Sequence, residues 1–266
     1  AGTGVGKSLF MCHHASSVLL QGRNVLYITM EMAEEKIAER IDANLLNVPI
    51  QDLTDLPKPM FDKKVTNLSK KTQGQLIIKE YPTASAHSGH FKTLLNELSL
   101  KKSFRPDIIF VDYLNICASS RYKANSGVNS YSYIKAIAEE LRGLAVEANL
   151  PIVSATQTTR SGFASSDVDL TDTSESFGLP ATADLMFALI STEELEELNQ
   201  IMVKQLKNRY NDPTIFKRFI IGIDRSKMRL YDVEQKAQDD ILDSGQEEEY
   251  NHEKAKPKKS FAEFKF

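Results

Sequence analysis

The chain opens with the stretch AGTGVGKS, and this glycine-rich stretch constrains the fold more than any other part of the sequence. Its spacing is that of a phosphate-binding loop, with Ala1 at the position where the commonest pattern has glycine. Small residues let backbone N–H groups converge on phosphate oxygens, and the helix that follows adds the positive end of its dipole. The stretch therefore predicts a nucleotide-binding α/β fold. The alternative is a glycine-rich turn that binds no ligand.

The predicted loop gives two of its side chains a chemical role. Lys7 supplies a compact cation for the β- and γ-phosphates, and the Ser8 hydroxyl can hold Mg²⁺. The expected nucleotide is ATP, with GTP left open. The residues expected to contact it are Gly2, Gly4, Val5, Gly6, Lys7 and Ser8.

A loop of this kind lies between a buried strand and a helix, and the strand comes first. No strand comes before the loop in this sequence. We expect the missing strand to precede Ala1 in a longer protein, so that the chain begins inside the loop. We also expect that the chain does not fold or assemble properly by itself, because its central sheet lacks that strand.

After the loop, short apolar runs alternate with helical stretches up to about residue 198. This rhythm is typical of βα units that build a mostly parallel sheet. Three strands then follow without helices between them, which predicts an antiparallel extension at one sheet edge. The expected strands are 24–29, 75–81, 107–113, 151–156, 183–190, 200–208, 216–224 and 228–233, and the expected helices are 8–22, 33–46, 90–102 and 133–149.

We expect one α/β domain over residues 1–236 and a charged tail over residues 237–266. The tail joins an acidic block, DDILDSGQEEE, to a basic block, KAKPKK, and such a segment cannot bury a core. It is therefore expected to be largely disordered. The final stretch SFAEFKF is either an unstructured end or a short aromatic anchor for a partner protein.

The composition limits the kinds of partner that the chain can have. A net charge of −3 means that any contact with nucleic acid comes from a local group of Lys and Arg side chains. Cys12 and Cys117 lack the spacing of a metal site, and the adjacent His13 and His14 point about 100° apart on a helix, so they do not chelate together. No apolar stretch approaches the ~18 residues of a membrane span, and no signal peptide is recognisable. We expect a cytoplasmic protein with reduced cysteines and no membrane partner.

Polar side chains follow three of the expected strands at the edge where open α/β sheets place their ligands. Asp112 ends an apolar run and can orient a metal ion, usually through water; the alternative is a residue that caps a turn. Glu31 is the best candidate for the base that activates the attacking water, unless it only begins the next helix. Gln157 either senses the γ-phosphate or satisfies local backbone groups.

Lys207 and Arg209 are two residues apart in an expected strand, so their side chains lie on one face. Two neighbouring cations repel each other unless an anion lies between them. The γ-phosphate bound by an adjacent subunit would serve as that anion. The alternative is a solvated face of an edge strand.

The stretches GVGKS, NVLYITMEMAEE, RIDAN, LLNELSLKK, IIFVDYLNIC, IKAIAEELRGLAVEA, GLPATAD and KNR agree in order and spacing with one family. Over residues 1 to about 230 the chain resembles the hexameric replicative helicases of DnaB type, which belong to the RecA-like ATPases, and most closely those of T-even bacteriophages. The resemblance implies the C-terminal motor domain of a homohexamer that encircles single-stranded DNA at the replication fork, moves 5′ to 3′ and unwinds the duplex. It also implies primase, a helicase loader and other replisome proteins as partners, in the cytoplasm of an infected bacterial host.

By position, the resemblance makes Glu31 the catalytic base, Asp112 the metal-orienting acid and Gln157 the sensor. Lys207 and Arg209 reach into the adjacent subunit's site. Loops facing the channel of the ring contact DNA, and the corresponding segments here are 119–130 and 158–178. The residues assigned to this contact are Arg121, Lys123, Asn125, Arg160, Ser174, Glu175, Ser176 and Gly178.

One position departs from the family pattern, because the bacterial members often carry an arginine where this chain has Ser174. Two other classes of function also fit the sequence. One is a RecA-like recombination ATPase that forms open filaments on single-stranded DNA. The other is a nucleotide-gated scaffold whose tail recruits partners.

Overall fold

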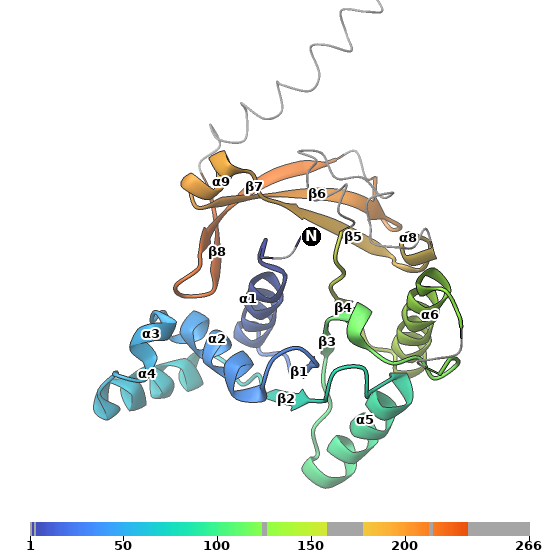
Figure 1. The fold of residues 1–266 in the computed structure, drawn as a ribbon. Helices are drawn as coiled ribbons and strands as arrows, with labels where there is room; N and C mark the ends of the chain where they lie inside the picture. Colours follow the sequence, from blue (N-terminus) through green and yellow to red (C-terminus); the bar gives the residue numbers. More distant parts are fainter. Residues whose placement is uncertain (1, 3, 124–126, 159–177, 213–214, 234–266) are drawn as a thin grey trace, which may run out of the picture.

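The computed structural model describes residues 2, 4–123, 127–158, 178–212 and 215–233, and it contains two four-stranded sheets. The first is parallel, with the strand order β2-β1-β3-β4, and the second is antiparallel, with the order β5-β6-β7-β8 (Figure 1). The strands are β1 (Val25–Thr29), β2 (Leu76–Glu80), β3 (Ile108–Asp112), β4 (Ile152–Ser154), β5 (Leu185–Ile190), β6 (Gln200–Asn208), β7 (Arg218–Asp224) and β8 (Arg229–Asp232).

Helices cover both faces of the parallel sheet. Alternate residues of β1 and β3 point to opposite faces, and all of them are buried, as expected for central strands of a parallel sheet. One face packs against α1 and α2, and the other against α5 and α6. The helices are α1 (Lys7–Leu20), α2 (Glu34–Leu46), α3 (Ile50–Leu53), α4 (Lys58–Lys71), α5 (Ser88–Lys102), α6 (Ser130–Ala148), α8 (Gly178–Thr182) and α9 (Glu193–Glu197), with a 3₁₀ turn at Leu114–Ile116.

Each strand expected from the sequence is present, and the four expected helices differ from the observed ones by three residues at most. The position of β5 is the main difference from the expected topology. It pairs antiparallel with β6 and belongs to the second sheet, because the short connection between the two strands allows a hairpin-like return. The helices α3, α4, α8 and α9 were not expected from the sequence. Three of them have only four or five residues, and α4 has no buried residue that would produce an apolar stripe.

The antiparallel sheet lies against the beginning of α1 (Figure 1). Val5 of the glycine-rich loop packs against Leu189, Ile201 and Val203 of this sheet. The loop is therefore held between the antiparallel sheet and the parallel sheet.

A groove of about 830 Å³ separates β4 from β5. Its lining is largely apolar and includes Phe10 of α1, Leu141 of α6, Val153 of β4 and Phe187 of β5. Lys7 also lines it, so the groove reaches the glycine-rich loop. Among the described residues, no helix is both long and apolar enough to span a membrane.

Candidate nucleotide and DNA site

The glycine-rich loop has the backbone geometry that its sequence predicts. Gly4 has a φ of 81° and Gly6 a φ of 116°, a region that side chains with a Cβ rarely adopt. The helix α1 begins at Lys7, directly after Gly6. The free N–H groups of its first turn therefore face the loop, where they can bind an anion.

Lys7 lies close enough to Glu31 and Asp112 for both carboxylates to affect its pKa. Its Nζ donates a hydrogen bond to the Gly2 carbonyl at 3.0 Å. Burial lowers the pKa of Lys7, while the charges of Glu31 and Asp112 act in the opposite direction. The cation is thus placed between the loop and the carboxyl edge of the sheet, as a phosphate-binding lysine must be.

Asp112 is the last residue of β3 and is only 1% exposed. Its Oδ2 accepts a hydrogen bond from the Tyr27 hydroxyl at 2.9 Å, whereas the buried Oδ1 has no hydrogen-bond partner among the described residues. Burial raises the pKa of Asp112, and the hydroxyls of Tyr27 and Ser8 partly oppose this rise. An unpaired buried carboxylate oxygen beside the Ser8 hydroxyl fits Mg²⁺, which prefers oxygen ligands.

Glu31 lies beside Asp112 at the same edge. The parallel register pairs Thr29 of β1 with Asp112 of β3, and Glu31 follows two residues after Thr29. Its side chain is exposed, and its charge acts on both Lys7 and Tyr113. The carboxylate is thus open to solvent, where a water molecule can reach it.

Gln157 follows the third strand end at this edge. Its Nε2 donates a hydrogen bond to the Tyr113 hydroxyl at 3.2 Å, and Tyr113 directly follows Asp112. The structure therefore brings Lys7, Glu31, Asp112 and Gln157 to one edge of the parallel sheet. The sequence does not predict the roles of Tyr27 and Tyr113, which hydrogen-bond to Asp112 and Gln157. The one signal for Tyr27 is a hydroxyl within the buried run of β1.

Lys207 contacts α8, and Arg209 contacts the segment that joins α8 to β5. Lys207 Nζ donates to the Pro180 carbonyl at 2.6 Å, and the Arg209 guanidinium lies 2.9 Å from Asp184 Oδ1. Asp184 also pairs with Arg142 at 2.7 Å. Asp184 of the same chain thus supplies an anion beside these neighbouring cations, and this residue was not expected from the sequence to have that role.

The first predicted DNA segment is attached to α6 through Glu140. Glu140 is 9% exposed, and its carboxylate accepts hydrogen bonds from the Ser119 hydroxyl at 2.6 Å and the Ser120 N–H at 2.9 Å. These donors lower the pKa of Glu140 although burial would raise it. Arg121 pairs with Glu139, and Lys123 is exposed.

The second predicted segment contributes two described residues, which are Thr158 at its beginning and Gly178 at its end, and Gly178 is buried at the beginning of α8. Of the other residues assigned to DNA contact, several lie outside the described part of the chain. They are Asn125, Arg160, Ser174, Glu175 and Ser176.

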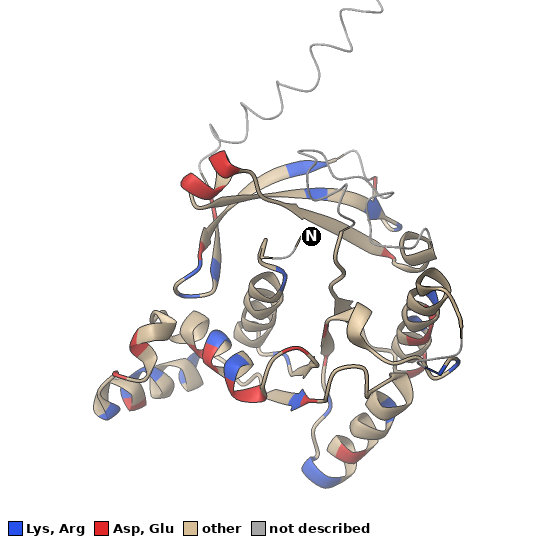
Figure 2. Ribbon diagram, in the orientation of Figure 1, with Lys and Arg blue, Asp and Glu red and all other residues tan. Residues whose placement is uncertain are grey.

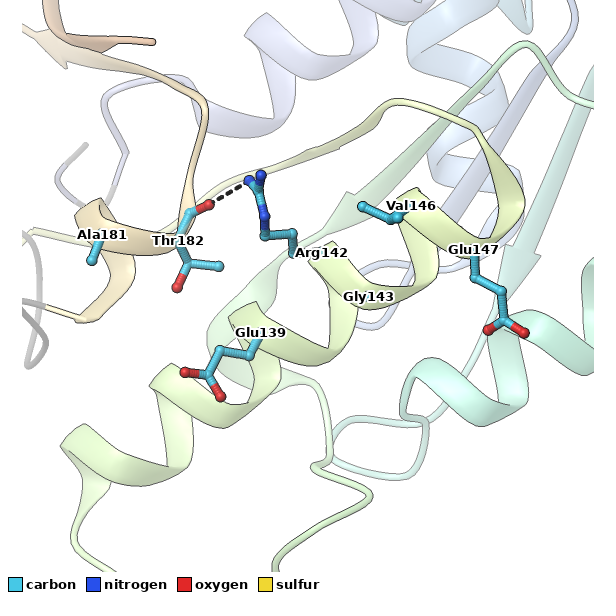
Figure 3. A pocket seen from close by; sticks show the side chains of 7 residues that line it. All are labelled: Glu139, Arg142, Gly143, Val146, Glu147, Ala181 and Thr182. Carbon is cyan, nitrogen blue, oxygen red and sulfur yellow. Dashed lines mark hydrogen bonds between the residues drawn. The ribbon is translucent and has the colours of Figure 1, made fainter.

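A separate surface pocket of about 470 Å³ lies between α6 and α8 (Figure 3). Arg142 crosses its rim and donates to the Thr182 carbonyl at 2.8 Å. Glu139 and Glu147 point outward from the same helix (Figure 3). The pocket is separate from the carboxyl edge of the sheet, because none of the nucleotide-site residues lines it.

Residues of both charge signs occur on α2 and α6, α4 carries mainly lysine, and acidic residues gather on α9 (Figure 2). Cys12 and Cys117 are free and buried, and burial raises the pKa of each thiol to about 12. Within the described residues, no group of three or more His, Cys, Asp or Glu side chains could hold a metal ion.

The family model of the DnaB-like helicase C terminal domain matches residues 1–226. A DnaB-like replicative helicase of Enterobacteria phage T4 is 48% identical over 238 residues, which cover 88% of this chain and 50% of that protein. A probable plasmid replicative DNA helicase of Chlamydia psittaci is 29% identical over 215 residues, which cover 77% of this chain and 45% of that protein. The chain thus spans about half the length of these curated relatives.

The fold is also similar to solved structures. The structure of a DnaB-like replicative helicase, described with its interactions with primase, has a TM-score of 0.72 at 17% identity. The match covers 88% of this chain and 56% of that chain. This likeness confirms the predicted fold class, a RecA-like α/β core with a parallel sheet and an antiparallel addition.

Proposed function

Because the chain belongs to the family of DnaB-like helicase C-terminal domains, we propose that it is the motor domain of a replicative DNA helicase. The motor couples ATP hydrolysis to 5′ to 3′ movement along single-stranded DNA and to unwinding at the replication fork. The observation that carries this proposal is the gathering of Lys7, Asp112 and Glu31 beside the glycine-rich loop. The relatives described above are named as helicases, so a filament-forming recombination ATPase is not favoured.

In this proposal the glycine-rich loop binds the nucleotide, and the carboxyl edge of the parallel sheet supplies the catalytic carboxylates. Lys7 and the N–H groups at the beginning of α1 bind the phosphates of ATP, and GTP stays open as a second substrate. Ser8 and Asp112 would hold Mg²⁺, which when bound neutralises charge on the β- and γ-phosphates. Glu31 accepts a proton from the attacking water, for which its exposed carboxylate at this edge is suited.

The nucleotide lies between subunits of a homohexamer. Gln157 senses the γ-phosphate from its own subunit, and Lys207 with Arg209 approaches the γ-phosphate of the adjacent subunit. In the chain described here Asp184 is the counter-ion of Arg209, at 2.9 Å. Arg209 then exchanges this carboxylate for the phosphate of a neighbouring site.

The segments 119–130 and 158–178 track the phosphates of single-stranded DNA in the channel of the ring. Backbone amides, hydroxyls and a few cations suffice for this contact, which needs no base recognition. Primase, a helicase loader and other replisome proteins are the proposed partners, and one structural neighbour is described with its interactions with primase. The proposed setting is the cytoplasm of an infected bacterial cell, in line with the phage relative.

The motor domain is proposed to comprise residues 1–236 together with one strand that would lead into the glycine-rich loop in a longer protein. The groove between β4 and β5 supports this extension. It lies between two strands that are not paired with each other, its lining is largely apolar, and Lys7 lies at one end of it. An apolar strand seated there would connect the two sheets and lead directly into the loop.

The proposal is tested by measuring ATP hydrolysis with and without single-stranded DNA. Glu31→Gln is expected to keep nucleotide and DNA binding while turnover falls about 10²- to 10⁴-fold, the usual contribution of a general base. Glu35→Gln, which removes an exposed carboxylate from the neighbouring helix α2, is the matched control and leaves turnover unchanged. Normal turnover by Glu31→Gln would remove this residue from the role of base.

The contribution between subunits needs a mixing experiment. Arg209→Ala is expected to reduce turnover on the order of 10³-fold without loss of nucleotide binding. Mixing it with Lys7→Ala subunits restores activity at hybrid interfaces if Arg209 acts on the adjacent site. Absence of DNA-stimulated hydrolysis in the unsubstituted protein would instead favour the nucleotide-gated scaffold.

A further inference from the structure

The beginning of the segment 119–130 is fixed to α6 through its backbone. The Glu140 carboxylate accepts hydrogen bonds from the Ser120 N–H at 2.9 Å and the Arg121 N–H at 3.3 Å. The Ser119 hydroxyl, itself bound to Glu140, accepts a second hydrogen bond from the Arg121 N–H at 3.1 Å. The backbone of Arg121 is thus anchored, and its side chain is the part that can change partner.

The side chain of Arg121 is paired with Glu139, the residue before Glu140 on α6. Its guanidinium lies 2.5 Å from Glu139 Oε2, and the two side chains are 51% and 37% exposed. Exposed ion pairs contribute only about 0.2–1 kcal/mol because water and salt screen them. A phosphate arriving from solvent can therefore replace Glu139 at little cost.

Glu139 has a second cation. Lys135 Nζ lies 3.8 Å from its other carboxylate oxygen, one helical turn away on α6. When Arg121 leaves, Glu139 keeps Lys135 as a partner and is not left unpaired. This arrangement lowers the cost of the exchange further.

Lys135 also reaches the second predicted DNA segment. A Cβ placed on Gly178 would lie only 2.6 Å from Lys135 Cδ, so the lysine stem fills the space that the glycine leaves open. Gly178 begins α8, at the end of the segment 158–178. A chain of contacts from Arg121 through Glu139 and Lys135 to Gly178 thus connects the ends of both segments.

We propose that Glu139 is a positioning residue that holds Arg121 in the absence of DNA and releases it to a phosphate of single-stranded DNA. This inference rests on the proposed function, because it assumes that the segment 119–130 meets DNA. Lys135 keeps Glu139 in place during the exchange and connects it to the second segment. The exchange makes the DNA affinity of Arg121 dependent on a carboxylate that itself does not touch DNA.

The test is a double-substitution cycle read by the fluorescence anisotropy of a labelled oligo-dT strand, with full-length protein and a non-hydrolysable ATP analogue. Glu139→Gln is expected to strengthen binding about two- to five-fold, the worth of an exposed ion pair. Arg121→Gln is expected to weaken binding and to reduce the slope of log K against log salt by about 0.7, the value for one phosphate contact on a single strand. In the Arg121→Gln background, Glu139→Gln is expected to have no effect.

Glu147→Gln is the matched control, since Glu147 is an exposed carboxylate two turns further along α6 and pairs with Lys92. It is expected to leave oligo-dT binding unchanged. Equal strengthening by Glu139→Gln in both backgrounds would show that Glu139 only repels DNA by its charge, and no strengthening would exclude an exchange; either result overturns the inference. If the unsubstituted protein does not bind oligo-dT, the proposed function fails first and the inference falls with it.

Discussion

The Tyr27 hydroxyl donates a hydrogen bond to the buried Asp112 carboxylate at 2.9 Å, and it opposes the raised pKa of Asp112 more than the Ser8 hydroxyl does. Tyr27→Phe removes this donor and a weak contact with the Cys12 thiol at 4.0 Å, while the fully buried ring stays stacked on Phe110. Hydrogen bonds to charged groups contribute about 1.5–3 kcal/mol. We therefore expect the free energy of unfolding at neutral pH to fall by about 2 kcal/mol.

The size of this loss depends on pH in a defined direction. Burial raises the pKa of Asp112 in the folded protein, and the Tyr27 hydrogen bond is the largest of the influences that lower it. An acid with a raised folded pKa destabilises the fold only where it is ionised, so its cost grows as pH rises through the folded pKa and vanishes below the unfolded pKa. Tyr27→Phe raises the pKa of Asp112 further, so its penalty is largest at neutral to alkaline pH and shrinks on acidification.

Urea denaturation followed by circular dichroism at several pH values measures this difference. Tyr81→Phe is the matched control, since no side-chain hydrogen bond contributes to the pKa of Tyr81. Its expected change is below about 0.5 kcal/mol at every pH, as for substitutions away from buried networks. A loss for Tyr27→Phe that stays constant with pH, or that does not exceed the control, would refute the link to an ionised Asp112.

Two glycine positions give opposite predictions. Gly6 has a φ of 116°, and an added Cβ would meet no atom closer than 3.8 Å, so the cost of Gly6→Ala comes from backbone strain. We expect the free energy of unfolding to fall by about 1–3 kcal/mol and a fluorescent ATP analogue to bind more weakly. Gly143→Ala lies within α6 with no atom near the added Cβ, so we expect stabilisation by about 0.5–1 kcal/mol in urea denaturation and unchanged nucleotide binding. Equal effects of the two changes would contradict the role assigned to the backbone of Gly6.

The sequence predicts the glycine-rich loop and the central strands of the parallel sheet well, because local signals determine them. A glycine-rich loop needs particular backbone angles, and the continuous apolar run before Asp112 needs a central parallel strand. What the sequence analysis left wrong is the partner of β5. The apolar character of β5 fits either sheet, and the short connection to β6 places it in the antiparallel sheet and not beside β4.

The partners of charged side chains are the hardest part of the site to predict from the sequence. For Glu140, however, the sequence does indicate that the carboxylate has a partner. Ile137 and Leu144 lie three residues before and four residues after Glu140, and both are buried on the apolar face of α6, whose helical spacing can be read from the sequence. A carboxylate on that face must be buried, and a buried carboxylate must accept hydrogen bonds. The periodicity therefore predicts that Glu140 is paired, but not that its donors come from Ser119 and Ser120. That identity depends on where the chain returns after β3, which only the folded structure determines.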